Sequence, residues 1–391
     1  MANKMILNQL KVRGLYGSYD YDLDFTNHVD SSVRFITAPN GYGKSTILRL
    51  IECFFNHSLT LLVSPKLRYS TIEFYMPKYR VHIFQKSTPA QELESDEPTG
   101  MVEAVISVFK PKGTNPIETK TITQKDVESQ KDDLLPKTLN IYLKSKSIHL
   151  IADNRLWVHD ANSEEHIVEL VEIVKNTIEK QDDKISRKFN ELMAYYASKQ
   201  SFVNTDIEKL CSKTGKLLSR YQAVGIAKEY EVCKMSDLNS PFRMAYLLSI
   251  SEAIGGEKQE LQKLELFSEW VRKCEFANKM MIFRKKDGVI FVSNDEISTK
   301  ILPEELSSGE KQLVVQAIEL LFCTPEDSLV LVDEPELSYH VAWQMLYCEN
   351  LKSIAKQRKL QCVVATHNPQ MFNYDWDLSI DLFTQQEQLH K

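Results

Sequence analysis

The chain opens with alternating apolar and polar positions. Between residues 5 and 37, apolar side chains recur at about every second position, and Gly14, Gly17 and the polar run 30–32 interrupt them. Period-two alternation broken by turn residues is typical of short β-strands. Further strand-like runs at 80–85 and 101–109 flank a polar, proline-containing loop at 87–100. The pattern therefore predicts three strands before residue 38 and at least two after it.

The spacing changes to that of a helix directly after the third predicted strand. Residues 38–46 read APNGYGKST, and the apolar positions that follow recur three and four residues apart, at Ile47, Leu48, Leu50, Ile51 and Phe54. The predicted order is strand, glycine-containing loop, helix.

The middle of the chain carries two long runs with helical periodicity. Apolar residues recur at steps of four and three between 167 and 196 and again between 207 and 224, with a polar stretch at 198–204 between the runs. This pattern predicts a short antiparallel helical hairpin over 163–232, although two helices buried in the main core would show the same periodicity. A further helix is predicted over 257–277, and Asp287-Gly288 indicates a hairpin turn.

Two apolar strands end in polar side chains near the C-terminus. A helix is predicted to start within 306–312, the apolar run 328–332 precedes Asp333 and Glu334, and the run 361–365 precedes Thr366-His367-Asn368. Open parallel sheets collect ligands at the carboxyl ends of their strands. These polar residues are therefore candidates for one site.

Composition and charge narrow the class of protein. The 391 residues are 43% hydrophobic and 26% charged, which is ordinary globular composition for two or three packed units. No apolar run approaches the ~20 residues that span a bilayer, and residues 1–4 open no signal peptide, so we expect a soluble, cytoplasmic chain without a membrane partner. The seven cysteines never stand as C-x-x-C, which argues against a disulfide framework or zinc site. The net charge of −6 disfavours a dedicated nucleic-acid binder but leaves a local basic groove open.

The glycine-containing loop matches the second half of the phosphate-binding pattern G-x-x-x-x-G-K-[ST]. Small residues there let backbone N–H groups surround phosphate oxygens at a helix N-terminus. Lys44 would contact the outer phosphates and Ser45 the magnesium ion. Ala38 replaces the first glycine, which restricts the first turn without removing a hydrogen-bond donor.

Carboxylates at the end of a buried strand are costly unless they serve a cation and a water. Asp333 is predicted to reach Mg²⁺ through its water shell, and Glu334 to act as general base on the attacking water. The alternative is a pair of charges that closes a sheet edge. His367 could hydrogen-bond the outer phosphate and sense its loss, or be a structural histidine.

Taken together, the segments 40–46, 306–310, 331–335 and 366–368, in this order, resemble an ABC-type ATPase head of the OLD-like and SMC-like AAA group. The resemblance implies an α/β fold: a mixed or parallel sheet core with the P-loop, an antiparallel β subdomain and an inserted helical hairpin. It divides the chain into lobe I (1–160), a helical insertion (161–280) and lobe II (281–391). It also implies that ATP and Mg²⁺ are bound, with hydrolysis that we expect to be slow.

The resemblance assigns residues to the site. Lys44, Glu334 and His367 would be catalytic, Ser45 and Asp333 would hold the metal, and nucleotide contacts would come from Asn40, Gly41, Tyr42, Gly43, Lys44, Ser45, Thr46, Ser307 and Gly309. Ser307 and Gly309 would act in trans, which implies a homodimer or a higher even-numbered homo-oligomer closed by ATP. Ser307 or Ser308 as a helix cap, with Glu310 in the first turn, is compatible with this role.

Three further positions are weaker candidates. The family's magnesium-binding glutamine could be Gln85 or Gln91, and the choice stays open. Arg155 closes a segment similar to a strand that ends in arginine in some relatives. The Asn-Phe-Arg stretch of the family's first strand is Gly14-Leu15-Tyr16 here, so no arginine stands at that place.

The spacing of the motifs bears on the kind of ATPase. About 260 residues separate Lys44 from the signature segment (Leu306 to Gln312), more than transporter subunits carry. The layout resembles repair and chromosome-maintenance heads and, in the run 334–344, the ATPases of bacterial anti-phage systems such as PARIS or Septu. Only 24 residues follow His367, too few for a Toprim nuclease, so we expect a separate effector protein, a nuclease or toxin. The first hypothesis is therefore a sensor or switch subunit.

Two alternatives remain. A DNA-repair or SMC-like ATPase would clamp duplex DNA, and the 11 Lys/Arg against 7 Asp/Glu in 180–234, with the basic triplet 284–286, would contact phosphates. A solvated helix face explains the same charges. In the other alternative, ATP is a structural clamp and the hairpin an adaptor that docks a protein.

Overall fold

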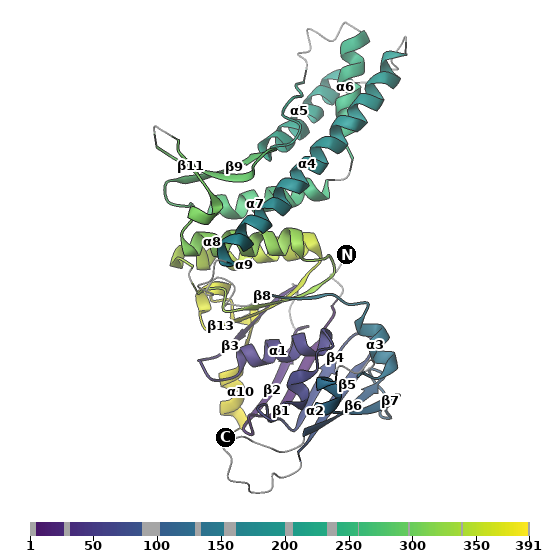
Figure 1. Cartoon of the computed structure of the whole chain (residues 1–391), viewed down its shortest axis with the longest axis vertical. Coiled ribbons are helices and arrows are strands. Elements are labelled where there is room, and N and C mark those ends of the chain that lie inside the picture. Colours follow the sequence, from purple (N-terminus) through teal and green to yellow (C-terminus); the bar gives the residue numbers. More distant parts are fainter. Residues whose placement is uncertain are drawn as a thin grey trace. The chain divides into compact units, whose positions relative to one another are not determined.

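The computed structural model describes residues 5–26, 32–87, 102–129, 134–151, 162–199, 206–232, 241–256, 258–295, 298–337 and 339–389. The chain divides into two compact units. Unit 1 comprises residues 1–155 and 324–391, and unit 2 comprises residues 156–323 (Figure 1). The signature segment therefore lies in unit 2, whereas Asp333 lies in unit 1; the three-segment division of the sequence stays a prediction.

A five-stranded parallel sheet forms the centre of unit 1. Its strands run in the order β14 (Ser379–Asp381), β3 (Val33–Thr37), β13 (Gln361–Thr366), β12 (Leu329–Asp333) and β8 (Ile148–Ile151). Every residue of β3, β12 and β13 is buried, as expected for central parallel strands covered on both faces. In register, Asp333 pairs with Ala365 and Thr366 with Thr37, so the carboxyl ends of these three strands meet at one edge.

A six-stranded antiparallel sheet completes the β-structure of unit 1. Its order is β2 (Tyr19–Asp24), β1 (Gln9–Leu15), β4 (Thr71–Tyr75), β5 (Arg80–Ser87), β6 (Val102–Phe109) and β7 (Glu118–Thr123). The predicted strands β1, β2, β3, β5 and β6 are confirmed. β4 and β7 are absent from the predicted elements, because β4 offers only two alternating buried positions, Ile72 and Phe74, and β7 only one fully buried residue, Ile122.

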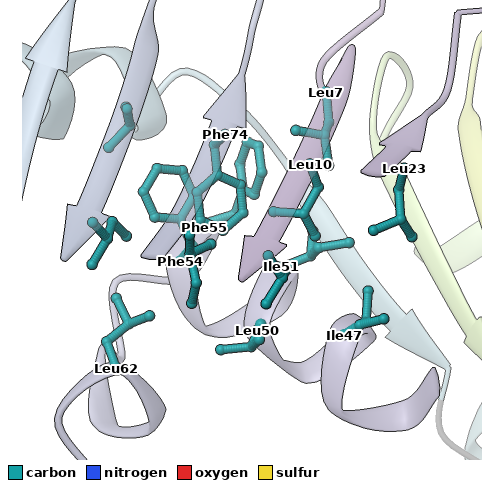
Figure 2. Packing of buried hydrophobic residues seen from close by; sticks show 14 of the residues in the cluster. Leu7, Leu10, Leu23, Ile47, Leu50, Ile51, Phe54, Phe55, Leu62 and Phe74 are labelled. Carbon is teal, nitrogen blue, oxygen red and sulfur yellow. The ribbon is translucent and has the colours of Figure 1, made fainter. Parts of the chain in front are cut away.

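Helix α1 (Lys44–Phe55) packs its apolar face against both sheets of unit 1. Figure 2 shows Ile47, Leu50, Ile51, Phe54 and Phe55 of this helix facing Leu7, Leu10, Leu23 and Phe74 of the strands, with Leu62 of the short helix η1 (Thr60–Val63) beside them. The rings of Phe54 and Phe74 stack with centroids 3.9 Å apart. This core fixes the helix that starts at the phosphate-binding loop.

The remaining helical elements of unit 1 surround this core. They are α2 (Gln124–Glu128), α3 (Lys137–Leu143), α9 (Val341–Arg358), η6 (Pro369–Phe372), η7 (Trp376–Leu378) and α10 (Leu382–Leu389). α9 packs against η6 and β3, and α10 against β2 and β3. α9 joins β12 to β13 along the chain.

Unit 2 combines helices with a small antiparallel sheet. Its elements are α4 (Asn162–Ala197), α5 (Ile207–Ala223), α6 (Pro241–Ile254), α7 (Gln259–Lys273), β9 (Lys279–Arg284), β10 (Gly288–Ser293), β11 (Lys300–Ile301), η4 (Pro303–Glu305), α8 (Ser308–Ile318) and the π-helical η5 (Glu319–Cys323). The predicted helix at 257–277 and the turn at Asp287-Gly288 are confirmed by α7 and by the β9–β10 pairing.

The predicted helical hairpin is confirmed in its helices but not in its pairing. α4 packs chiefly along α6, and α5 also packs on α6, so the group has three helices (Figure 1). α6 is absent from the predicted elements, because its buried residues surround much of the helix and give little periodicity. α4 is buried at Ile167, Val174 and Ile178, whereas no residue in 186–197 is buried. The buried residues of α4 therefore end at Ile185, and its last three turns carry none.

None of the helices in the described part combines the length and apolar composition that crossing a bilayer requires. Among the described cysteines, four are buried: Cys53, Cys274, Cys348 and Cys362.

Candidate functional site

The phosphate-binding loop joins β3 to α1 at the carboxyl edge of the parallel sheet. Gly41 and Gly43 take left-handed backbone angles, with φ of 91° and 82°. The left-handed angle at Gly43 favours glycine, and a Cβ atom there would lie in tight contact with Leu15 Cδ2, at 3.1 Å. α1 begins at Lys44 with no side chain capping its N–H groups. The helix N-terminus is therefore available to an anion.

Lys44 is buried beneath this loop. Its ammonium donates to the carbonyl oxygens of Ala38 at 2.9 Å and Pro39 at 3.3 Å, and lies 3.9 Å from Glu334 Oε1. The side chain is 4% exposed. A buried cation with one nearby carboxylate is poised to exchange carbonyl partners for phosphate oxygens.

Ser45 and Asp333 lie side by side. The Ser45 hydroxyl donates to Asp333 Oδ1 at 3.0 Å, although 288 residues separate them. A hydroxyl and a carboxylate are oxygen ligands of the kind Mg²⁺ prefers, and Mg²⁺ completes its shell with waters and substrate phosphates. The described residues hold no group of three His, Cys, Asp or Glu side chains suited to a metal. Ser45 and Asp333 would thus supply two oxygen ligands to a magnesium ion whose other ligands are waters and phosphates.

Glu334 follows Asp333 in a strained conformation. Its φ is 41°, which costs a non-glycine residue about 1–3 kcal/mol, and its N–H donates to Ala365 O at 2.9 Å. Its Oε1 lies 3.9 Å from Lys44 Nζ and 3.8 Å from His367 Nδ1. The structure thus places the predicted base between the two other predicted catalytic side chains.

Glu336 also lies at the carboxyl edge of the parallel sheet, although no sequence pattern assigned it to the site. Its Oε1 accepts hydrogen bonds from Thr366 Oγ1 at 2.5 Å and His367 N at 3.0 Å, and lies 3.1 Å from His367 Nδ1. The residue is 5% exposed. Burial raises the pKa of the Glu336 carboxyl, opposed by the hydrogen bonds from Thr366 and His367 and by the His367 charge. The only sequence signal that could have identified Glu336 as a site residue is that it is a second carboxylate, two residues after Glu334.

Helix α9 connects the two loops that carry these residues. Gln344 Nε2 donates to Tyr339 O at 3.1 Å, and Gln344 Oε1 accepts from Asn368 Nδ2 at 2.6 Å. Thr366 Oγ1 also accepts from Asn368 N at 3.0 Å. The loop after β12 and the loop after β13 are therefore tied to one helix.

Aromatic side chains anchor the phosphate-binding loop. Tyr42 O accepts from Tyr21 at 2.8 Å, and the Tyr42 ring centroid lies 5.6 Å from those of Tyr19 and Phe383. The Thr46 hydroxyl is 2.5 Å from that of Tyr16. Asn40 and Gly41 are exposed, so the loop presents its tip to solvent.

The signature segment is organised within unit 2. Ser307 caps α8 in a reciprocal capping box with Glu310, whose Oε2 accepts from Ser307 N at 2.8 Å and from Lys279 Nζ at 2.6 Å. Burial would raise the pKa of Glu310, but the bonds from Lys279 and Ser307 outweigh it and lower that pKa. Ser307 and Ser308 are exposed, while Gly309 is buried. The predicted cap is confirmed.

The structure does not bring Gln85 to the site. Its amide oxygen accepts from Tyr69 N at 3.0 Å and its amide nitrogen donates to Leu67 O at 2.9 Å, so both ends of the side chain hold neighbouring backbone. Gln91 and Arg155 lie outside the described residues.

The geometry of this edge agrees with a comparison against family models. The model described as AAA ATPase domain matches residues 5–372. The chain belongs to the AAA ATPase domain family. A comparison with curated proteins gave no match.

The solved structures similar to this AAA ATPase domain include SMC head domains. One from Pyrococcus furiosus, with an extended coiled coil and bound to the C-terminal domain of ScpA, is 15% identical over 94% of this chain and 90% of that chain, with a TM-score of 0.38. One from Thermotoga maritima is 12% identical over 96% and 92%, with a TM-score of 0.35. The fold is α/β, with a parallel and an antiparallel sheet and a helical insertion.

Proposed function

We propose that this AAA ATPase domain binds ATP with Mg²⁺ and hydrolyses it. One observation carries the proposal: residues far apart in sequence converge at the carboxyl edge of one parallel sheet, with Ser45 on Asp333 at 3.0 Å and Glu334 between Lys44 and His367. A phosphate-binding loop, two oxygen ligands for a divalent cation and a carboxylate base are the groups that phosphoryl transfer to water needs.

Each residue has a role in the proposed reaction. The N–H groups of 40–46 surround the phosphates, and Lys44 moves from the carbonyls of Ala38 and Pro39 to a phosphate oxygen. Ser45 and Asp333 would hold Mg²⁺, and the ion would supply positive charge that neutralises the phosphates. Glu334 accepts the proton of the attacking water, and His367 donates a hydrogen bond to the terminal phosphate.

ATP is proposed to close two copies into a dimer. The exposed Ser307 and the α8 N-terminus of one copy would complete the site of the other. Because each site would need two chains before water can attack, turnover would be slow. In trans completion is implied by the ABC-type resemblance and is supported by the exposure of Ser307.

The biological role proposed is that of a sensor or switch subunit in a bacterial anti-phage system, which controls a separate effector nuclease or toxin. This role rests on the likeness of residues 334–344 to the ATPases of such systems.

The structure supports the alternative function, a clamp on duplex DNA, less well. Lys285 lies 2.6 Å from Asp182 and 3.1 Å from Asp183, Arg220 pairs with Glu265 at 2.7 Å, and Lys188 donates to a backbone carbonyl. These basic groups of unit 2 already have partners within the chain. A solvated, internally paired face therefore explains them better than a phosphate-binding groove.

Steady-state ATP hydrolysis tests the proposal. The purified chain is assayed at low and moderate salt, with and without linear duplex DNA, and Glu334→Gln serves as the blank. Hydrolysis that the variant abolishes, with ATP binding retained and a dimer accumulating in light scattering, is expected. Equal turnover in the variant would refute the assignment. Stimulation by DNA that weakens with salt would favour the clamp.

The defence role needs a test in cells. Bacteria that carry the chain with its neighbouring genes are challenged with phage, and plaque numbers are compared with those for Glu334→Gln. Protection lost in the variant, together with a co-purifying effector, is the expected result. Equal plaque numbers with and without the genes, over a broad phage panel, would contradict it.

A further inference from the structure

Glu336 is the most deeply buried carboxylate near the predicted catalytic side chains, and the proposed reaction gives it no role. Its side chain is 4% exposed, compared with 21% for the side chain of Glu334. Its Oε1 takes hydrogen bonds from Thr366 Oγ1 and His367 N and lies 3.1 Å from His367 Nδ1. Its Oε2 is buried and has no hydrogen-bond partner among the described residues. Burying a carboxylate with one oxygen unpaired is costly, so its presence here calls for a functional or structural explanation.

The contacts of Glu336 converge on a single side chain. Two of its three close contacts are to His367, one through the backbone N–H and one through the ring. The third holds Thr366, the residue directly before His367. The carboxylate therefore fixes the backbone and the ring of the histidine at the same time.

The outer part of the histidine remains accessible. The His367 side chain is 42% exposed, and Glu334 Oε1 lies 3.8 Å from the same Nδ1 atom, farther than Glu336 Oε1. A carboxylate that accepts a hydrogen bond from Nδ1–H holds the ring in place. In the imidazolium form, which carries a proton on both nitrogens, Nε2–H is left to donate to a phosphate oxygen. The buried Glu336, and not the base Glu334, is the closer partner of the ring.

We propose that Glu336 is a positioning residue for hydrolysis, which holds His367 through Nδ1 and the backbone N–H so that Nε2 faces the terminal phosphate. The inference rests on the proposed ATPase function. It also separates two carboxylates in one short segment: Glu334 acts on water, and Glu336 acts only through the histidine.

A double-mutant cycle tests the proposal. When two residues act as one unit, removing the second causes little further loss of kcat after the first has been removed. Steady-state kinetics are measured for wild type, Glu336→Gln, His367→Ala and the double variant. Each single change is expected to lower kcat at least tenfold, with KM within threefold. The double variant should lie within twofold of the slower single variant. A double variant whose loss is the product of the single losses would overturn the proposal.

A matched variant separates positioning from general loosening of the loop. Thr366→Val removes the hydrogen bond to the same Oε1 atom and the one that Thr366 accepts from Asn368 N, but it leaves both contacts of Glu336 with His367. Its kcat is expected within threefold of wild type, even where its melting temperature falls. A loss of kcat equal to that of Glu336→Gln would mean that the carboxylate acts on the loop as a whole, and would overturn the proposal.

Two outcomes distinguish this inference from the function on which it rests. If Glu334→Gln abolishes hydrolysis and His367→Ala slows it, but Glu336→Gln remains within threefold of wild type, the positioning role alone fails. If Glu334→Gln hydrolyses at the wild-type rate, the ATPase assignment fails and the inference with it. In ¹⁵N-histidine spectra, the resonance lost in His367→Ala should report protonated Nδ1 in wild type and change in Glu336→Gln.

Discussion

The cap of the signature helix allows a quantitative prediction, because one buried carboxylate oxygen accepts two hydrogen bonds. Glu310 Oε2 lies 2.6 Å from Lys279 Nζ and 2.8 Å from Ser307 N. The Glu310 side chain is 5% exposed and that of Lys279 is 22% exposed, so water cannot readily replace the lost contact. The perturbation is Glu310→Gln, which preserves shape and removes the charge.

The magnitude follows from the contacts. A hydrogen bond to a charged group contributes about 1.5–3 kcal/mol and a helix cap about 1 kcal/mol. The glutamine amide keeps one acceptor and so retains part of the cap. The expected loss is therefore about 2 kcal/mol of local stability, which corresponds to roughly 30-fold faster amide exchange across α8 if exchange follows local opening.

Hydrogen–deuterium exchange of peptides that cover 306–318 measures this loss. Lys300→Met is the control: Lys300 pairs with Asp287 at 2.9 Å in the same small sheet, but the two side chains are 46% and 32% exposed. An exposed pair contributes about 0.2–1 kcal/mol, so the control should change exchange less than about fivefold. Less than threefold acceleration in Glu310→Gln would refute the argument that this ion pair organises the signature segment.

The pH dependence has a definite sign. The pKa of Glu310 is lowered on folding, so its contribution is present above its ordinary pKa of 4.5 and is lost as pH falls through the folded value. The difference in urea midpoint between wild type and Glu310→Gln should therefore be full at neutral pH and shrink on acidification below that value. A difference that grows toward acid pH would contradict the ion-pair explanation.

Three further predictions concern the core, the helical insertion and the metal ligands. Phe74→Ala removes a fully buried ring stacked at 3.9 Å on α1 and should cost about 3–5 kcal/mol in urea denaturation; a loss below 1 kcal/mol would contradict the packing. Asp182→Asn should destabilise unit 2 far more than Asp183→Asn in thermal unfolding, because Asp182 is 3% exposed and accepts from Ala227 N and Lys285, whereas Asp183 is 61% exposed; equal losses would contradict this. Ser45→Ala should raise the Mg²⁺ concentration needed for half-maximal hydrolysis at least tenfold and leave the melting temperature within 2 °C, and an unchanged Mg²⁺ requirement would contradict the assigned ligand.

Local signals were sufficient for most of the elements that build the nucleotide edge. The loop between β3 and α1, the strands β12 and β13 and the cap of α8 are each encoded within about ten residues, by periodicity, glycine and capping chemistry. Their meeting at one edge follows from the rule that parallel strands share a carboxyl end. The 3.0 Å contact of Ser45 with Asp333 is the direct expression of that rule.

Features set by long-range packing were beyond the sequence patterns. α6 buries several sides at once and so shows little periodicity, although it is the main partner of α4. The positive φ of Glu334 carries no residue signal, because glycine or asparagine would be expected at such an angle. In the sequence, Glu336 looks like any charged residue that follows a strand. Only the fold brings it into contact with His367, which lies 31 residues later in the chain.

Contacts within one chain organise both half-sites of the proposed dimer. In unit 1, Ser45 meets Asp333, and Glu334 already stands between Lys44 and His367. In unit 2, the signature helix is capped and held by Lys279 through Glu310. Binding energy from ATP would then not be needed to build either half and would be available to join two copies. A trigger that controls such a switch would act on the closing of two copies into a dimer. It should therefore change the ATP-dependent dimer equilibrium without changing the affinity of the open monomer for nucleotide. A trigger that alters only the nucleotide affinity of the monomer would argue against preformed half-sites.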